Sequence, residues 1–359
     1  MNMNLKNSRP CGDFRTSYHR DMSMFDDKKG FYLTCLGILF LIFSPLFLDS
    51  YLISLLIYIG FYAIAALGLN ILVGFTGQIS VGHAVFFGFG AFASAWLNNN
   101  FAIPVFFCIP LAAILTALVG LLFGIPAARV KGLYLAIATL AAQFIMEDFF
   151  SRASWFTGGV DGASAEPLKV FGIFFDTDTK YFFIVLFWVV ISFILATNIL
   201  RTRDGRAFLA VRDHYLSAEM MGINLTKYRI LSFGISSFFA GLGGALYGHY
   251  LNFVSIEEFN IQLSITFLAM IIIGGLGSVR GSIMGAAFMV LLPEIMDWFT
   301  RSLAGTPIDN ALSLSEAIPF IKEASIGSVI ILFLIFEPNG LAYRWGQIRA
   351  WFKLYPFSY

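Results

Sequence analysis

Polar side chains and glycines interrupt an apolar stretch at residues 68–92, GLNILVGFTGQISVGHAVFFGFGAF, in which His83 is the only titratable residue. In hydrocarbon every backbone N–H and C=O must be satisfied internally, so a break there is stable only where protein buries it or water fills a cavity. This chemistry is typical of transport. We therefore predict that polar residues near the break line a translocation path, and these residues are Asn70, Thr76, Gln78, Ser80 and His83. In the alternative interpretation, each of them bonds helix backbone across a packed interface.

A second segment with functional potential is the polar stretch 201–229, which carries six basic and three acidic residues. Phe208, Val211, Tyr215 and Ala218 recur at helical spacing, which predicts an amphipathic helix, and Gly222 is placed to end it. An apolar stripe outside the bilayer needs a partner. We predict insertion into a groove on a cytoplasmic protein, and the alternative is a surface helix held by anionic membrane lipid.

Several kinds of chemistry have no matching motif in the sequence. There is no G-x-x-x-x-G-K-[ST] for phosphates, no H-E-x-x-H for zinc, and no basic patch interleaved with aromatic residues for nucleic acid. Predicted membrane segments contain almost no charged residue of the kind that ion- or proton-coupled carriers use. Cys11, Cys35 and Cys108 have no metal-ligand spacing. We expect a transporter rather than an enzyme or metalloprotein, and one whose energy enters through another subunit.

The composition indicates which elements must position these residues. Hydrophobic residues make up 58% of the 359-residue chain and charged residues only 13%, against about 25% charged in an ordinary soluble domain. Repeated apolar runs have the length of about 20 residues that spans a bilayer. The sequence predicts an all-α polytopic membrane protein with broken, glycine-rich helices and about ten transmembrane segments, at 31–48, 51–74, 81–97, 101–125, 132–150, 181–200, 229–250, 262–278, 281–300 and 324–337.

The distribution of basic residues predicts the orientation. With both termini in the cytoplasm, only five of the 23 Lys and Arg residues fall outside, which leaves 18 inside, as the positive-inside rule requires. This places 201–229 in the cytoplasm. The predicted organisation is a polar cytoplasmic tail at 1–30, a membrane domain at 31–337 and a cytoplasmic tail at 338–359. The segment 271–286, IIIGGLGSVRGSIMGA, has the same character as the first break and suggests an internal repeat.

Six blocks of sequence in order carry a resemblance to a known family. They are residues 68–92 together with ARVKGLYLAIATLA (128–141), WFTGGVDG (155–162), GRAFLAVRDHYLSAEMMGIN (205–224), GGLGSVRGSIMGA (274–286) and FEPNGLAYR (336–344). In these blocks the chain resembles the branched-chain amino-acid ABC-importer permease family, and within it the M-type subunit of the two-permease pair.

The resemblance implies a permease subunit of the bacterial inner membrane that imports branched-chain or similar hydrophobic amino acids. Its implied partners are a second homologous permease, a periplasmic substrate-binding protein and two cytoplasmic ATPase subunits, which bind ATP-Mg; the chain itself is expected to bind no cofactor. The alternatives are a urea or short-amide importer permease and, in another class, a stand-alone channel or secondary carrier.

The block at 205–224 corresponds to the coupling segment of such importers, whose usual pattern is Glu-Ala-Ala, three residues and Gly. Here Leu216-Ser217-Ala218 precedes Gly222, with Glu219 displaced from the usual glutamate position. By this resemblance, the residues expected to couple the chain to the ATPases are Arg206, Phe208, Val211, Tyr215, Ala218, Glu219 and Gly222.

Overall fold

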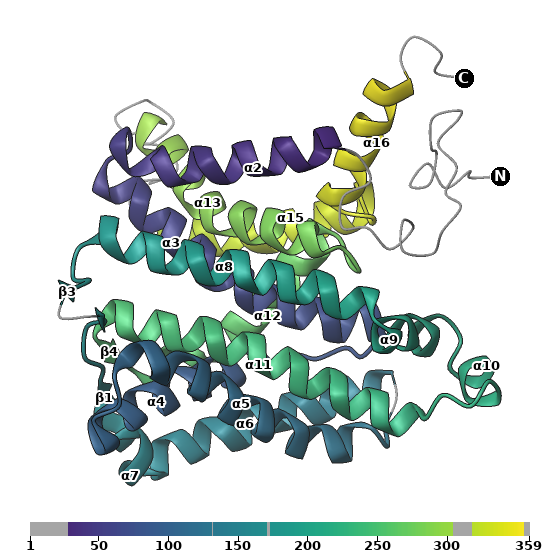
Figure 1. Ribbon diagram of the computed structural model, residues 1–359, viewed down its shortest axis with the longest axis horizontal. Helices are drawn as coiled ribbons and strands as arrows, with labels where there is room; N and C mark the ends of the chain where they lie inside the picture. The colour runs from purple at the N-terminus through teal and green to yellow at the C-terminus, as the bar shows by residue number, and fades with distance from the viewer. Residues whose placement is uncertain (1–27, 131, 171–172, 304–317, 355–359) are drawn as a thin grey trace.

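A computed structural model describes residues 28–130, 132–170, 173–303 and 318–354. In these residues the chain is a bundle of long helices, with short strands gathered at one end and two short helices, α9 and α10, projecting from the other (Figure 1). Most of the predicted N-terminal tail (1–27) and residues 304–317 of the last long outer segment lie outside the described residues.

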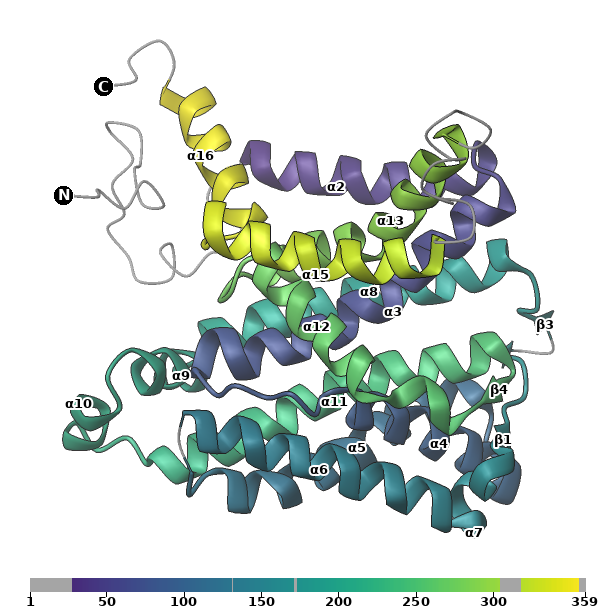
Figure 2. The same cartoon turned by 180° about the vertical axis from the view of Figure 1, so that it is seen from behind.

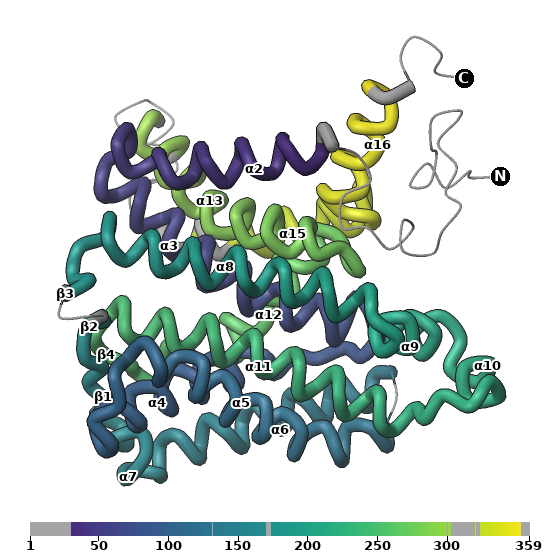
Figure 3. The backbone as a smooth tube through the Cα atoms, viewed as in Figure 1, coloured from purple at the N-terminus to yellow at the C-terminus, as the bar shows by residue number. Residues whose placement is uncertain are grey.

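Each of the ten predicted segments coincides with a helix. Figures 2 and 3 show the reverse view and the path of the backbone. The helices are α2 Lys28–Phe43, α3 Ser50–Asn70, α4 Ala84–Phe101, α5 Val105–Ala127, α6 Leu133–Arg152, α8 Asp178–Arg201, α11 Leu225–Leu251, α12 Ile261–Gly274, α13 Val279–Leu303 and α15 Ile318–Phe336.

Six of the helices in the described residues are long and apolar enough to cross a membrane, and the number rises to seven if a pair bent by 48° (Ala324–Phe336 and Leu341–Phe352) is one span. This confirms an all-α, multi-pass membrane protein. α12 has only 14 residues, about 21 Å at 1.5 Å per residue, which is short of a bilayer. The count of ten spans and the cytoplasmic position of both termini stay predictions.

Helix α11 lies at the centre of the bundle and packs against α3, α4 and α5. Glycines make this close approach possible. A Cβ atom added at Gly244 of α11 would lie 1.8 Å from the carbonyl oxygen of Phe87 on α4. One added at Gly90 of α4 would lie 2.2 Å from the carbonyl oxygen of Gly241 on α11. Any larger residue at either position would force the two backbones apart, as expected for small residues between membrane helices.

The predicted outer connections are tied together by short strands. β1 (Ala163–Ser164) pairs antiparallel with β4 (Phe253–Val254), so the 151–180 segment is joined to the chain that leaves α11. β2 (Lys169–Val170) pairs with β3 (Ile173–Phe174). Three short helical turns complete these connections, α7 Ser154–Thr157, η4 Gly159–Asp161 and η5 Ile256–Phe259.

At the other end of the chain, the predicted C-terminal tail contains a helix, α16 (Leu341–Leu354). The helix follows Gly340, whose φ of +73° turns the chain away from α15.

The orientation can be tested by labelling single cysteines in a variant whose three native cysteines are replaced by serine. Ser164 and Glu257 are exposed at the strand-bearing end, and Asp213 is exposed at the end of α9. We expect an impermeant thiol reagent to label Ser164→Cys and Glu257→Cys in intact cells. It should label Asp213→Cys only after the membrane is permeabilised. Labelling of Asp213→Cys in intact cells would reject the predicted orientation.

Candidate functional site

The first glycine-rich break begins where α3 ends. α3 passes into a π-helical turn, η3 (Ile71–Phe75), and the chain then continues in extended form to the start of α4 at Ala84 (Figure 2). Gly77 adopts φ +70°, a conformation that L side chains rarely take. π-helical turns are frequent at functional sites because they change the direction of the backbone without ending the helix abruptly.

The second break separates α12 from α13 and contains Gly275 and Gly277, both with positive φ. Asn70 joins the two breaks. Its side chain, 1% exposed, accepts a hydrogen bond from the backbone N–H of Gly277 at 2.8 Å. Its amide nitrogen donates to the carbonyl of Ser278 at 2.9 Å and to the hydroxyl of Ser282 at 2.8 Å. In this structure Asn70 therefore bonds across a packed interface, as in the alternative interpretation.

Thr76 and Gln78 connect the first break to α11. The Thr76 hydroxyl donates to the carbonyl of Leu72 at 2.6 Å. The Gln78 amide nitrogen lies 2.6 Å from the hydroxyl of Ser232 on α11 and 2.9 Å from that of Thr76. Both side chains are buried, so the extended segment is fixed to the central helix by side-chain hydrogen bonds rather than by a regular ladder.

His83 and Ser80 lie near the end of the extended segment and differ in their hydrogen bonding. His83 is 1% exposed, and its Nε2 lies 3.0 Å from the carbonyl of Ala65 on α3. Ser80 is fully buried, yet its hydroxyl has no hydrogen-bond partner among the described residues, and the same holds for Oε1 of Gln78. Buried polar atoms are normally paired, so two unpaired atoms in one segment need an explanation.

The predicted amphipathic helix is two helices, so the expectation of one continuous helix is wrong. α9 (Arg203–Asp213) and α10 (Tyr215–Met220) meet at His214, whose φ of −157° and ψ of 86° interrupt the helix. The His214 imidazole lies 3.2 Å from the hydroxyl of Ser217.

The predicted apolar stripe divides between the two helices. Phe208, Val211 and Ala218 are buried, and the ring of Phe208 packs edge-on against Tyr228 of α11 at 5.9 Å. Tyr215 is exposed, as are Arg206 and Glu219. α9 therefore uses its stripe to pack on the bundle.

The tip of α10 carries an uncovered apolar surface. Leu216, Met220 and Met221 are 54%, 88% and 84% exposed. Gly222 ends the helix with φ +83°, which confirms the predicted cap, and the N–H of Ile223 donates to the carbonyl of Ala218. No heavy atom lies within 4 Å of a Cβ added at Gly222, so only the backbone conformation selects glycine there.

Arg212, one of the six basic residues of the 201–229 segment, connects α9 to both breaks. Its Nη1 donates to the carbonyl of Gly74 at 2.7 Å, and its Nε donates to Asp213 at 2.8 Å. A Cβ added at Gly77 would lie 3.1 Å from Arg212 Cγ, and one added at Gly277 would lie 3.1 Å from Nη1. The four-residue spacing from the predicted apolar residue Phe208 could have indicated that Arg212 faces the bundle.

The described part of the chain thus places the predicted loop and the predicted break in direct contact. Arg212 links the loop to the first break, and Asn70 links the first break to the second. Of the predicted loop residues, Phe208 and Val211 hold α9 on the bundle, while Tyr215 and Glu219 lie on the projecting helix. The loop and both breaks are thus joined by side-chain hydrogen bonds.

Comparison with known proteins gives a consistent family. Residues 51–335 match the family described as the permease component of the branched-chain amino acid transport system. The chain is 30% identical to the high-affinity branched-chain amino acid transport system permease protein LivM of Salmonella typhimurium, over 78% of this chain and 67% of the relative. No solved structure gives a significant match.

Two more distant relatives are also permease proteins. A probable branched-chain amino acid transport permease protein LivM of Methanocaldococcus jannaschii is 25% identical over 80% of this chain and 92% of the relative. An autoinducer 2 import system permease protein LsrC of an Enterobacter species is 25% identical over 66% of this chain and 70% of the relative. From the match over residues 51–335 and the identity to LivM, we conclude that the chain belongs to the branched-chain amino acid transport permease family.

Proposed function

We propose that this chain is a permease subunit of a binding-protein-dependent ABC importer that moves branched-chain amino acids across the bacterial inner membrane. Its partners would be a second permease, a periplasmic substrate-binding protein and two ATPase subunits that hydrolyse ATP-Mg. The single structural observation that supports this most directly is the contact of Arg212 with the carbonyl of Gly74. It connects a projecting loop to a broken membrane helix, as an externally driven transporter needs.

The loop has the two properties of a coupling element. α10 offers the exposed side chains of Leu216, Met220 and Met221, a compact apolar knob suited to a groove on an ATPase. α9 is held on the bundle by the buried side chain of Phe208, so a displacement of α10 that moves α9 also acts on the bundle. Methionine at the tip suits a surface that must stay in contact while its partner changes shape.

The first break is the proposed start of the translocation path. In the described conformation it is closed, because Thr76, Gln78 and His83 are buried and hydrogen-bonded. Two buried atoms, Ser80 Oγ and Gln78 Oε1, have no hydrogen-bond partner among the described residues in this closed state. In an open state these atoms would hydrogen-bond to water or substrate. This would explain why the segment keeps two polar atoms whose burial without a partner destabilises the closed state.

The substrate proposal rests on relatives whose names specify branched-chain amino acids, among which LivM of Salmonella typhimurium is 30% identical. The experiment is to reconstitute both permeases with the ATPases and to add binding proteins loaded with different solutes. We expect ATP hydrolysis and uptake with leucine, isoleucine or valine, and neither with urea or a short amide. If only the urea-loaded or amide-loaded binding protein stimulates ATP hydrolysis and uptake, that solute is the substrate and the amino-acid proposal is rejected.

Arg212→Gln tests the connection from loop to break. The glutamine side chain is two atoms shorter and uncharged, so it loses the charge-assisted bond to Gly74, which contributes about 1.5–3 kcal/mol for a charged donor. Since 36% of the Arg212 side chain is exposed to solvent, we expect the low end of that range. Substrate imported per ATP hydrolysed should fall about tenfold, while the ATPases still bind.

Arg203→Gln is the matched control for this measurement. It removes the same charge from the exposed start of α9 without touching either break. The control should keep the normal ratio of substrate to ATP. Equal ratios in both variants would show that Arg212 does not transmit the movement.

Cysteine labelling tests the path. We expect Gln78→Cys and Ser80→Cys to react with a small hydrophilic thiol reagent during turnover, at a rate that changes when the ATPases bind ATP. Ser232→Cys, on α11 beside Gln78, reports whether the opening extends to the central helix. If Gln78→Cys and Ser80→Cys both transport normally yet stay unreactive in every nucleotide state, the segment is packing and the path lies elsewhere.

A further inference from the structure

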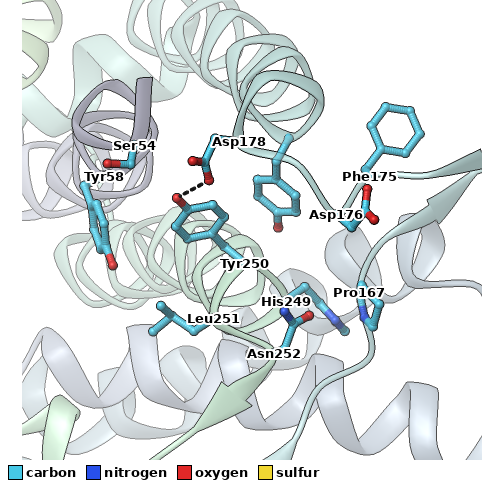
Figure 4. Close-up of a pocket in the computed structure, with 11 residues that line it drawn as sticks. Ser54, Tyr58, Pro167, Phe175, Asp176, Asp178, His249, Tyr250, Leu251 and Asn252 are labelled. Carbon is cyan, nitrogen blue, oxygen red and sulfur yellow. Dashed lines mark hydrogen bonds between the residues drawn. The ribbon is translucent and has the colours of Figure 1, made fainter. Parts of the chain in front are cut away.

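A cavity of about 390 Å³ opens at the strand-bearing end of the bundle, where α3, α8 and α11 meet (Figure 4). Its volume lies within the range of small-molecule sites. Carboxylate, hydroxyl, aromatic and aliphatic groups all contribute to its lining. The residues that line it include Ser54, Tyr58, Asp178, Tyr250, Leu251 and Phe175.

Asp178 gives the cavity a negative charge. Its carboxylate accepts hydrogen bonds from the hydroxyl of Tyr250 at 2.9 Å and from that of Ser50 at 2.5 Å. These neutral donors fix the carboxylate but leave its charge uncompensated. The nearby cation of Lys180 pairs with Asp176 at 3.7 Å, and Asp178 has no ion pair among the described residues. A fixed carboxylate beside an open cavity is suited to a cationic ligand group.

Tyrosine rings continue inward from the cavity. On α3, Ser54, Tyr58 and Tyr62 follow at four-residue spacing and so share one face of the helix. On α11, the ring of Tyr250 lies 5.9 Å from that of Tyr58, and the ring of Tyr247 lies 6.2 Å from Tyr58 and 6.5 Å from Tyr62. A tyrosine face attracts an ammonium group that lies within about 6 Å of the ring centroid.

Polar atoms along these rings are available for a ligand. Among the described residues, no hydrogen-bond partner is found for the hydroxyls of Tyr58 and Tyr62, or for Oε2 of Glu258. Glu258 lies in η5, and burial raises the pKa of its carboxyl, while a hydrogen bond from Tyr247 opposes that shift. The aromatic stack therefore has a carboxyl group at each end, Asp178 in the outer cavity and Glu258 beside Tyr247.

We propose that this cavity is an outer substrate site that binds the α-ammonium group of a free amino acid between Asp178 and the rings of Tyr58 and Tyr250. The inference rests on the proposed function and narrows its substrate class. Leu251 and Phe175 offer apolar contact to an aliphatic side chain. A neutral urea or amide would gain nothing from the Asp178 charge, so the site selects zwitterionic amino acids over the solutes of the alternative importer.

The first test measures the charge preference of the cavity in the assembled complex. Ser54→Cys is introduced into the variant without native cysteines, with Leu251→Cys as a second position if Ser54→Cys does not fold. A cationic methanethiosulfonate reagent should react about fivefold faster than an anionic reagent of similar size, and Asp178→Asn should remove most of that preference. Asp148→Asn, an outer carboxylate on α6 outside the cavity, should leave it unchanged.

The second test uses three ligands that share the isobutyl group of leucine to protect Ser54→Cys from an uncharged methanethiosulfonate reagent. Leucine and 3-methylbutylamine carry the ammonium group and should slow labelling, whereas 4-methylpentanoate lacks it and should not. Protection should be lost with Asp178→Asn.

The two proposals fail in different ways. If the wild-type complex imports leucine but none of these ligands protects Ser54→Cys, or the acid protects as well as the amine, the outer site is rejected and the importer stands. If the complex imports no amino acid while urea drives uptake, the proposed function itself is rejected.

Discussion

The structure depends on how the backbone groups of two glycine-rich breaks are satisfied inside a membrane protein. Lipid offers no hydrogen bonds, so each turn needs a protein partner. Asn70 provides both a donor and an acceptor to the turn at Gly277 and Ser278, and Arg212 donates to Gly74. These bonds make the two breaks a single unit. A movement of one break must move the other. Leaving a buried polar group without its hydrogen bond costs more free energy than shifting the second turn along with the first.

This unit lies where α9 rests on the bundle, which gives the loop mechanical access to the membrane domain. A surface helix that touched only α11 would meet a continuous helix, which resists bending. Through Arg212 it meets a π-helical turn and an irregular segment, whose dihedral angles can change at lower cost. The closed conformation is then held by many small polar contacts, such as Gln78 with Ser232, that an external push can break one at a time.

The sequence predicted the positions of the helices well, since apolar length alone identifies them. It also predicted the cap at Gly222, because few residues other than glycine adopt φ +83°. It missed the interruption at His214, because the stripe of apolar residues continues across this position. It also missed the role of Arg212, because hydropathy and charge counts describe segments one at a time. Which distant turn a side chain reaches depends on packing that no single segment encodes.

The outer cavity and the inner unit lie at opposite ends of the same two helices. α3 carries Tyr58 near the cavity and Asn70 at the breaks, and α11 carries Tyr250 near the cavity and Ser232 beside Gln78. A helix transmits displacement along its axis with little loss, so a movement that breaks the bonds at Asn70 also shifts Tyr58 relative to Tyr250. Ammonium binding between Asp178 and these rings would resist or favour that shift. By linkage, the same coupling free energy would act at the loop. The two sites therefore need no contact with each other to be coupled.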